Sequence, residues 1–167
     1  ANCKLPPKEK KEMQIIPPEK PGDYLRAAEE HGVLPMFYLE LTTGLRRGEL
    51  LALLWTDLNI KEKCLTVSKS VARCKGELRV TEPKTKNSVR TVYVDDETIR
   101  LLAEDRKNHP FSPYLFTSPV TDGMYGPDCV GRIHKKLLKR AGIEECVRFH
   151  DLRRTFATMA LQNGVDV

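Results

Sequence analysis

The period of the apolar residues changes in the middle of this chain, and that change is the strongest constraint on its fold. Between residues 64 and 94 the stretches CLTVSKSV, GELRVT and SVRTVYV are rich in β-branched residues and roughly alternate apolar with polar side chains. The turn-prone sequences KG and KTKN separate them. Alternation over a few residues between turn signals indicates strands. We therefore expect a small three-stranded antiparallel sheet.

Helical patterns precede this region. DYLRAAEE, from Asp23, predicts a helix that ends at Gly32, and the apolar stretch LPMFYLELTTG predicts a buried helix that ends at Gly44. The next stretch, LRRGELLALLW, predicts a helix with one apolar face, and the turn TDLN follows. The residues on that face are Leu50, Leu51, Leu54 and Trp55.

Further helices follow the strands. Asp95 and Asp96 are expected to cap DETIRLLAEDRKN, a helix that should stop before Pro110. A proline-rich loop then leads to a helix from Asp128 to Arg140. Its inward side chains are expected to be Val130, Ile133, Leu137 and Leu138, and its basic ones Arg132, Lys135, Lys136, Lys139 and Arg140. Such a charge run is usually a solvated face, and contact with DNA is the alternative. The order of elements predicts a mainly α, α+β domain.

The first twenty residues, ANCKLPPKEKKEMQIIPPEK, contain two proline pairs and five lysines, which do not sustain a helix. We interpret residues 1–22 as an extended linker. A chain of 167 residues, of which 40% are hydrophobic and 31% charged, suits one globular domain, residues 23–167.

Composition narrows the functional classes. A net charge of +5 mildly favours anionic partners. The five cysteines never form a CxxC spacing, so we expect reduced thiols and no metal site. The sequence has no charged-then-apolar leader and no run of ~18 apolar residues, which predicts a cytoplasmic protein without membrane contact.

Three basic positions stand at the edges of the expected elements, where anion sites are commonly built: Arg46, Lys84, and His150 with Arg153. On a helix, the spacing of three lets one phosphate meet both His150 and Arg153. The apolar residues of that helix are expected to face the core: Leu152, Phe156, Met159 and Ala160. Each basic position also has an interpretation that involves no function. Arg46 can form a surface pair with Glu49, and Lys84 can keep a turn solvated.

Three segments resemble, in the correct order, the signature boxes of the tyrosine recombinase, or phage integrase, family: TGLRRGELLALLWTDL, EPKTKNSVRTVYV and FHDLRRTFATMAL. The resemblance runs from about Asp23 to Val167 and is greatest to integrases of conjugative transposons. It implies a catalytic domain with helices around a small sheet. Such domains perform site-specific DNA recombination or integration through a 3′-phosphotyrosine intermediate, without metal or other cofactor. Double-stranded DNA is the implied partner, with the full-length protein a tetramer on DNA and this chain alone monomeric or weakly associating.

The resemblance also implies roles for single residues. Arg46 and Arg153 resemble the two arginines that clamp the scissile phosphate, and His150 resembles the box histidine beside them. Lys84 is similar to the hairpin lysine that protonates the departing 5′ oxygen, with Lys86 as the alternative. Guanidinium groups suit this task because they make paired, charge-assisted hydrogen bonds to phosphate oxygens. An alkoxide leaving group likewise needs a positioned acid.

Glu49 resembles the acidic residue that holds the first box in place. The chain departs from the family pattern at its end, because members continue to a further His or Trp and then to the nucleophilic tyrosine. All tyrosines here precede the HDLRR box: Tyr24, Tyr38, Tyr93, Tyr114 and Tyr125. We therefore expect a catalytic domain that is incomplete at its C-terminus, separated from its N-terminal DNA-binding region and inactive alone in strand cleavage. The alternatives are a DNA-binding accessory or vestigial recombinase, and an unrelated helical regulator with a basic face.

Overall fold

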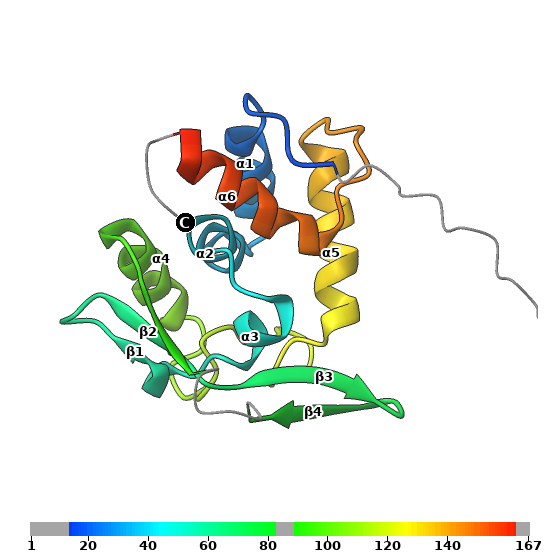
Figure 1. Cartoon of the computed structure of the whole chain (residues 1–167). Helices are drawn as coiled ribbons and strands as arrows, with labels where there is room; N and C mark the ends of the chain where they lie inside the picture. Colours follow the sequence, from blue (N-terminus) through cyan, green and yellow to red (C-terminus); the bar gives the residue numbers. More distant parts are fainter. Residues whose placement is uncertain (1–13, 83–88, 163–167) are drawn as a thin grey trace, which may run out of the picture.

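Helices packed beside a small sheet make up the structure, a computed structural model that describes residues 14–82 and 89–162. The elements are α1 (Pro21–Glu30), α2 (Leu34–Thr43), α3 (Arg47–Ala52), the 3₁₀ turn η1 (Trp55–Asp57), β1 (Leu58–Asn59), β2 (Cys64–Val67), β3 (Ser70–Cys74), β4 (Glu77–Thr81), β5 (Arg90–Tyr93), α4 (Asp96–Arg106), α5 (Pro127–Arg140), the 3₁₀ turn η3 (Phe149–Asp151) and α6 (Leu152–Gln162). In Figure 1 α1, α2, α5 and α6 gather on one side, with the strands along the opposite edge. The predicted class, mainly α within α+β, is confirmed.

The strands form two sheets instead of one. A three-stranded antiparallel sheet has the order β1-β2-β5, and β3 pairs with β4 in a separate ribbon. The prediction of a three-stranded sheet holds, but its membership was wrong in two places. GELRVT forms β4 in the ribbon, and the expected turn TDLN supplies β1. The alternation in CLTVSKSV runs on through the break between Val67 and Ser70, so the pattern does not reveal that two strands lie there.

The ribbon lies against α3, where a glycine permits close contact. A Cβ atom on Gly48 would come within 2.6 Å of the carbonyl oxygen of Val71 in β3. Val71 itself is buried. At the far end of β3, Arg73 forms an ion pair of 2.9 Å with Asp128 in the first turn of α5. The ribbon therefore touches both α3 and α5, as it runs along the lower edge of Figure 1.

The described part of the predicted linker packs onto the domain. Ile16 is only 1% exposed, and its backbone N–H donates to the hydroxyl of Thr155 in α6 at 3.2 Å. Helix α1 begins at Pro21, before the expected start at Asp23, because proline is well tolerated in the first turn of a helix. The expected linker is thus shorter than 1–22, and its residues 1–13 lie outside the described part of the chain.

Helix ends follow local capping signals. Gly44 adopts a left-handed conformation (φ 60°) and ends α2, and the Asp95 side chain accepts from the Thr98 N–H at 2.8 Å to begin α4, both as predicted. Helix α3 ends at Ala52, earlier than predicted. Just beyond it, the Asp57 carboxylate accepts from the Leu54 N–H at 2.9 Å and so favours a turn there over continued helix.

The core runs from α1, α2 and α5 to α3, α4 and the inward side of β2, and it includes the predicted apolar face of α5. Val130, Ile133, Leu137 and Leu138 are all buried there. In α6 Leu152 is fully buried, whereas Phe156, Met159 and Ala160 are only partly so. Among the described residues, no helix is both long and apolar enough to cross a membrane.

A buried histidine joins three parts of this core. His134 of α5 is 1% exposed; its Nε2 lies 2.9 Å from the Val147 carbonyl oxygen and its Nδ1 2.7 Å from the Tyr24 hydroxyl. A carbonyl only accepts, so Nε2 carries the proton and Nδ1 accepts from Tyr24. Phe37 and Phe149 pack on the same ring. The neutral imidazole thereby ties α1 and α5 to the segment before η3.

This arrangement predicts acid sensitivity. Burial lowers the pKa of His134, although its bond to the Val147 carbonyl opposes the shift. A base with a lowered folded-state pKa contributes stability above its unfolded pKa of about 6.5 and loses it as pH falls. We expect the free energy of unfolding, from urea denaturation followed by Trp55 fluorescence, to fall below about pH 6.5, by at most about 1.4 kcal/mol per pH unit. His134→Gln should remove this slope; an unchanged slope in that variant would contradict the assignment.

Candidate functional site

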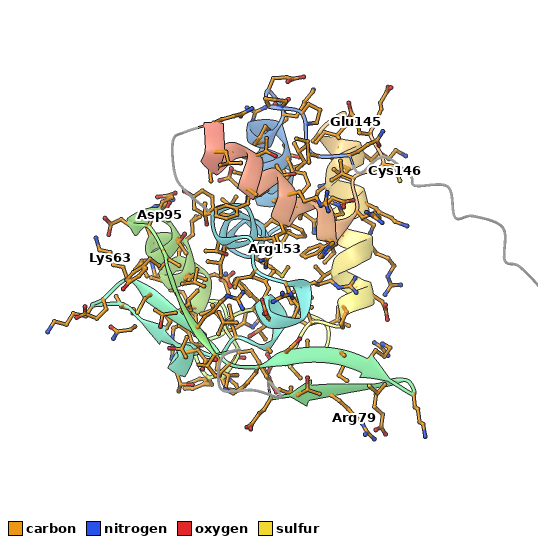
Figure 2. The ribbon with its side chains drawn as sticks, in the orientation of Figure 1. Lys63, Arg79, Asp95, Glu145, Cys146 and Arg153 are labelled. Atoms are coloured by element: carbon orange, nitrogen blue, oxygen red, sulfur yellow. The ribbon has the colours of Figure 1, made fainter. Side chains whose placement is uncertain are left out.

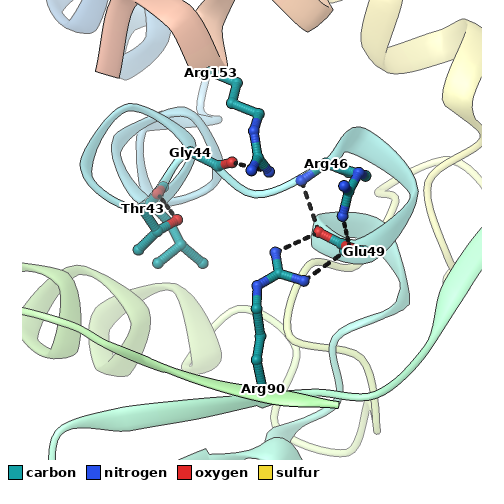
Figure 3. A network of polar contacts seen from close by, with 7 residues as sticks. Thr43, Gly44, Arg46, Glu49, Arg90 and Arg153 are labelled. Carbon is teal, nitrogen blue, oxygen red and sulfur yellow. Dashed lines mark hydrogen bonds and ion pairs between the residues drawn. The ribbon is translucent and has the colours of Figure 1, made fainter. Parts of the chain in front are cut away.

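The C-terminal end of α2 meets α6 at Gly44. The Gly44 N–H donates to the Glu40 carbonyl at 2.9 Å, while its own carbonyl accepts from Arg153 Nη1 at 3.0 Å. A Cβ atom on Gly44 would lie 2.6 Å from the ring of Phe156, so only glycine lets α6 approach this closely. Figure 3 shows the Arg153 side chain reaching from α6 to this carbonyl. Arg46 follows two residues after Gly44, so the chain brings both predicted arginines to one short segment.

Glu49 is the centre of a hydrogen-bond network beside that segment. Its Oε2 accepts from the Arg46 backbone N–H and its Oε1 from Arg46 Nη1, both at 2.9 Å. Arg90 of β5 donates through both terminal nitrogens, at 3.0 and 2.8 Å. Burial of Glu49 raises its pKa, but the hydrogen bonds from Arg90 and Arg46 outweigh that effect and hold the pKa at about 2. Glu49 is therefore a carboxylate that fixes the start of α3 to the sheet (Figure 3).

Both arginines keep donors available. The Arg46 side chain is 61% exposed, and the half-buried Arg153 donates one hydrogen bond to the Gly44 carbonyl. A guanidinium has five N–H donors, so most of those on each arginine remain for a ligand. In Figure 2 Arg153 lies near the middle of the molecule, where α6 passes α2. Two planar cations beside one glycine turn suit an oxyanion such as phosphate.

His150 lies near this pair in the sequence without bonding to it. It is exposed on η3, three residues before Arg153, and among the described residues no hydrogen bond joins it to either arginine. The same turn is held by buried Asp151, which accepts from the backbone N–H of Arg148 at 3.0 Å and from its guanidinium. Those hydrogen bonds lower the pKa of Asp151. The proposed role of His150 stays a prediction.

The predicted lysines, Lys84 and Lys86, lie outside the described residues. The described chain on either side of them reaches the site. Glu82 lines a pocket of about 90 Å³ together with Glu49, and Arg90 bonds Glu49 directly. The described residues Glu82 and Arg90, on either side of the two lysines in the sequence, thus both lie at the Glu49 network.

The basic residues of α5 face solvent. Arg132, Lys135, Lys136 and Lys139 are exposed, and no ion pair to an acidic residue is formed by them within the described residues. Across residues 14–82 and 89–162, no three His, Cys, Asp or Glu side chains gather closely enough to hold a metal ion. The face of α5 therefore carries uncompensated positive charge.

Two residues of this region were missed by sequence reasoning, and each carries a signal. Arg90 shares the half-buried face of β5 with Val92, and an arginine on an inward strand face needs an acidic partner. Glu40 is an acidic residue in the otherwise apolar stretch LPMFYLELTTG and is only 1% exposed.

Comparison with known proteins gives consistent matches. The model of the phage integrase family matches residues 24–167. A XerC-like tyrosine recombinase of Caldanaerobacter subterraneus subsp. tengcongensis is 32% identical over 184 aligned residues, covering 95% of this chain and 46% of that protein. The ICEBs1 integrase of Bacillus subtilis is 29% identical, covering 99% of this chain and 48% of that protein. The chain thus spans about half the length of these relatives.

Solved structures agree in fold. The Tn1549 transposon integrase in complex with a circular intermediate DNA has a TM-score of 0.83 at 19% identity, covering 97% of this chain and 57% of that chain. The XerA recombinase has a TM-score of 0.74 at 27% identity, covering 97% of this chain and 55% of that chain. The first likeness, at low identity, shows the fold.

The Glu49 network predicts a large and pH-dependent contribution to stability. Glu49→Gln removes the charge that two arginines share, so we expect the free energy of unfolding at pH 7 to fall by about 2 to 3 kcal/mol. Because the folded pKa of Glu49 lies near 2, its contribution is present above about pH 4.5 and disappears as pH falls through 2. Urea denaturation at several pH values measures both effects.

The matched control is Glu97→Gln, which breaks the exposed pair with Arg100 on α4. It should leave the urea midpoint unchanged, since exposed ion pairs contribute little. Equal effects of the two substitutions would show that Glu49 is an ordinary surface partner.

Proposed function

Because this chain belongs to the phage integrase family, we propose that it is the phosphate-holding part of a catalytic domain that cleaves and rejoins DNA at specific sites. The resemblance inferred from the three sequence boxes is confirmed at the level of the family. In this proposal the reaction passes through a 3′-phosphotyrosine intermediate, as the resemblance implies. Double-stranded DNA is the substrate, and the whole protein acts as a tetramer on it.

The carrying observation is that Arg153 of α6 binds the Gly44 carbonyl, two residues before Arg46, whose side chain is exposed and held by Glu49. In-line attack on a phosphodiester gathers negative charge on the non-bridging oxygens, and preorganised guanidinium donors stabilise it. The Glu49 network holds Arg46 through its backbone and one terminal nitrogen, leaving its other donors for the phosphate. We assign His150 to the same phosphate, and Lys84, or alternatively Lys86, to protonation of the departing 5′ oxygen.

The tyrosines of the chain support a nucleophile supplied by polypeptide outside these 167 residues. Tyr24 is fully buried, and burial raises its pKa. Burial likewise raises the pKa of Tyr38 and of Tyr125 to about 12. A phenol with a raised pKa is harder to activate as a nucleophile. Tyr93 is 77% exposed on β5, on the strand face opposite Arg90.

Helix α5 supplies a second contact with DNA in this proposal. Its exposed, unpaired basic side chains suit the phosphate backbone, and neutralising phosphates makes binding strongly salt-dependent. We expect the 167-residue chain to bind short duplex DNA weakly. Changing Lys135 and Lys136 together to Ala should weaken binding and reduce the slope of log affinity against log salt by about two.

The control for that measurement removes the same charge elsewhere. Lys61 and Lys107 lie in the β1–β2 turn and after α4, so changing both to Ala should leave the salt slope nearly intact. Fluorescence anisotropy of labelled DNA over a range of salt concentrations measures the slope. If both double variants reduce the salt slope equally, DNA binding depends on net charge alone and α5 makes no specific contact with DNA.

Strand cleavage tests the catalytic proposal. A protein that contains this chain and the polypeptide encoded after it should become covalently attached to a nicked recombination-site DNA. Arg153→Ala should slow attachment by on the order of a hundredfold or more, because one preorganised donor contributes ~3 kcal/mol to the transition state. Denaturing gel electrophoresis measures the adduct. DNA binding without any adduct would favour an accessory or vestigial protein instead, and an adduct formed by the 167 residues alone would refute an outside nucleophile.

A further inference from the structure

Glu40 is a buried acidic residue next to the candidate site, and the proposed mechanism does not use it. It lies in the last turn of α2 and is 1% exposed. Its Oε2 is fully shielded from solvent and has no hydrogen-bond partner among the described residues. Its backbone carbonyl accepts from the N–H of Gly44, the residue whose own carbonyl binds Arg153. A buried carboxyl oxygen without a hydrogen-bond partner therefore belongs to a residue one helical turn from the point where Arg153 docks.

Charged and titratable groups from three other elements act on this carboxyl. Arg153 of α6 attracts its ionised form, while Glu49 of α3 opposes it. Tyr24 of α1 is also within electrostatic range, since Glu40 contributes to the raised pKa of that phenol. The negative end of the α2 dipole adds to the cost of a charge here. Desolvation by burial is the largest effect and, with Glu49, raises the pKa of Glu40 to about 8 against the opposing attraction of Arg153.

We propose that Glu40 is a positioning residue of the anion site. Protonated, it leaves the charge of Arg153 free for the phosphate, and ionised, it draws Arg153 toward the interior of the domain. The inference rests on the proposed function, because it concerns the same phosphate. The environment of the Glu40 Oε2 atom fits the protonated form, because a buried carboxylate oxygen without hydrogen-bond donors is strongly destabilised.

The ionised Glu40 carboxylate and a bound phosphate compete for the Arg153 guanidinium. A phosphate bound at Arg153 adds a negative charge near Glu40 and favours its protonated form. Reciprocally, ionisation of Glu40 weakens phosphate binding by the same factor, because the two equilibria are linked. Arg153 is the shared element, since it contacts the end of α2 and also offers its remaining donors to the ligand. The site thus loses affinity as pH rises through the pKa of Glu40.

The test measures affinity for a short duplex DNA from about pH 7 to about pH 9 at constant salt. For the unaltered 167-residue chain, we expect affinity to fall on the order of threefold to tenfold over this range, a shift of up to about one pKa unit between free and bound forms. Glu40→Gln has the same shape and stays neutral, so its affinity should remain constant. The exposed residue Glu62 provides the control, because Glu62→Gln should retain the fall seen in the unaltered chain.

A second measurement does not depend on any substitution. Carbon-13 NMR of the Glu40 side-chain carboxyl in the unaltered chain should show a titration midpoint near 8 and an upward movement of that midpoint when DNA is added. A midpoint near 4.5, as for an exposed glutamate, would overturn the proposal, as would an equal pH dependence in Glu40→Gln.

The outcomes also separate this inference from the proposed function. If Arg153→Gln weakens DNA binding while Glu40→Gln follows the unaltered chain, the phosphate site stands and the role of Glu40 is refuted. If Arg153→Gln leaves DNA binding at pH 7 unchanged, the phosphate site itself is refuted.

Discussion

The paired hydrogen bonds between Glu49 and Arg90 are the interaction on which the rest of the site depends. Helix α3 has only six residues, too few to be stable alone, and Glu49 attaches it to β5 while capping its first turn. The same carboxylate orients Arg46. The carboxylate of Glu49 therefore pairs with both Arg46 and Arg90. One negative charge holds two positive charges in a partly buried place, so a net positive charge remains.

Gly44 is the second constraint, and it acts through shape. Its left-handed conformation ends α2, its carbonyl accepts from Arg153, and its missing side chain makes room for Phe156 of α6. As a result, Arg153 reaches a residue 109 positions earlier in the chain. Shape at Gly44 thus positions Arg153 at this segment, and charge at Glu49 fixes Arg46 two residues later.

Sequence reasoning succeeded where the determinants are local. Gly44 and Asp95 mark helix ends through conformational preference and side-chain capping, and both were predicted correctly. It failed where the partners are distant: the alternation of β4 does not say whether its neighbour is β2 or β3. The site divides in the same way. Local motifs identified Arg46 and Arg153. The role of Arg90 follows only from its hydrogen bonds to Glu49, a residue far away in the sequence, and the role of Glu40 follows only from its burial.

The contact between Arg153 and Gly44 joins two parts of the candidate site that are synthesised far apart in time. Arg46, Glu49 and Arg90 leave the ribosome well before α6, because domains emerge from the N-terminal side. A nascent chain that has not reached residue 153 carries only the first of the two arginines that we propose to hold phosphate, and it still lacks the helix that packs against α2. The second of the two arginines that we propose to hold phosphate is therefore made only with α6, the helix that also packs against α2.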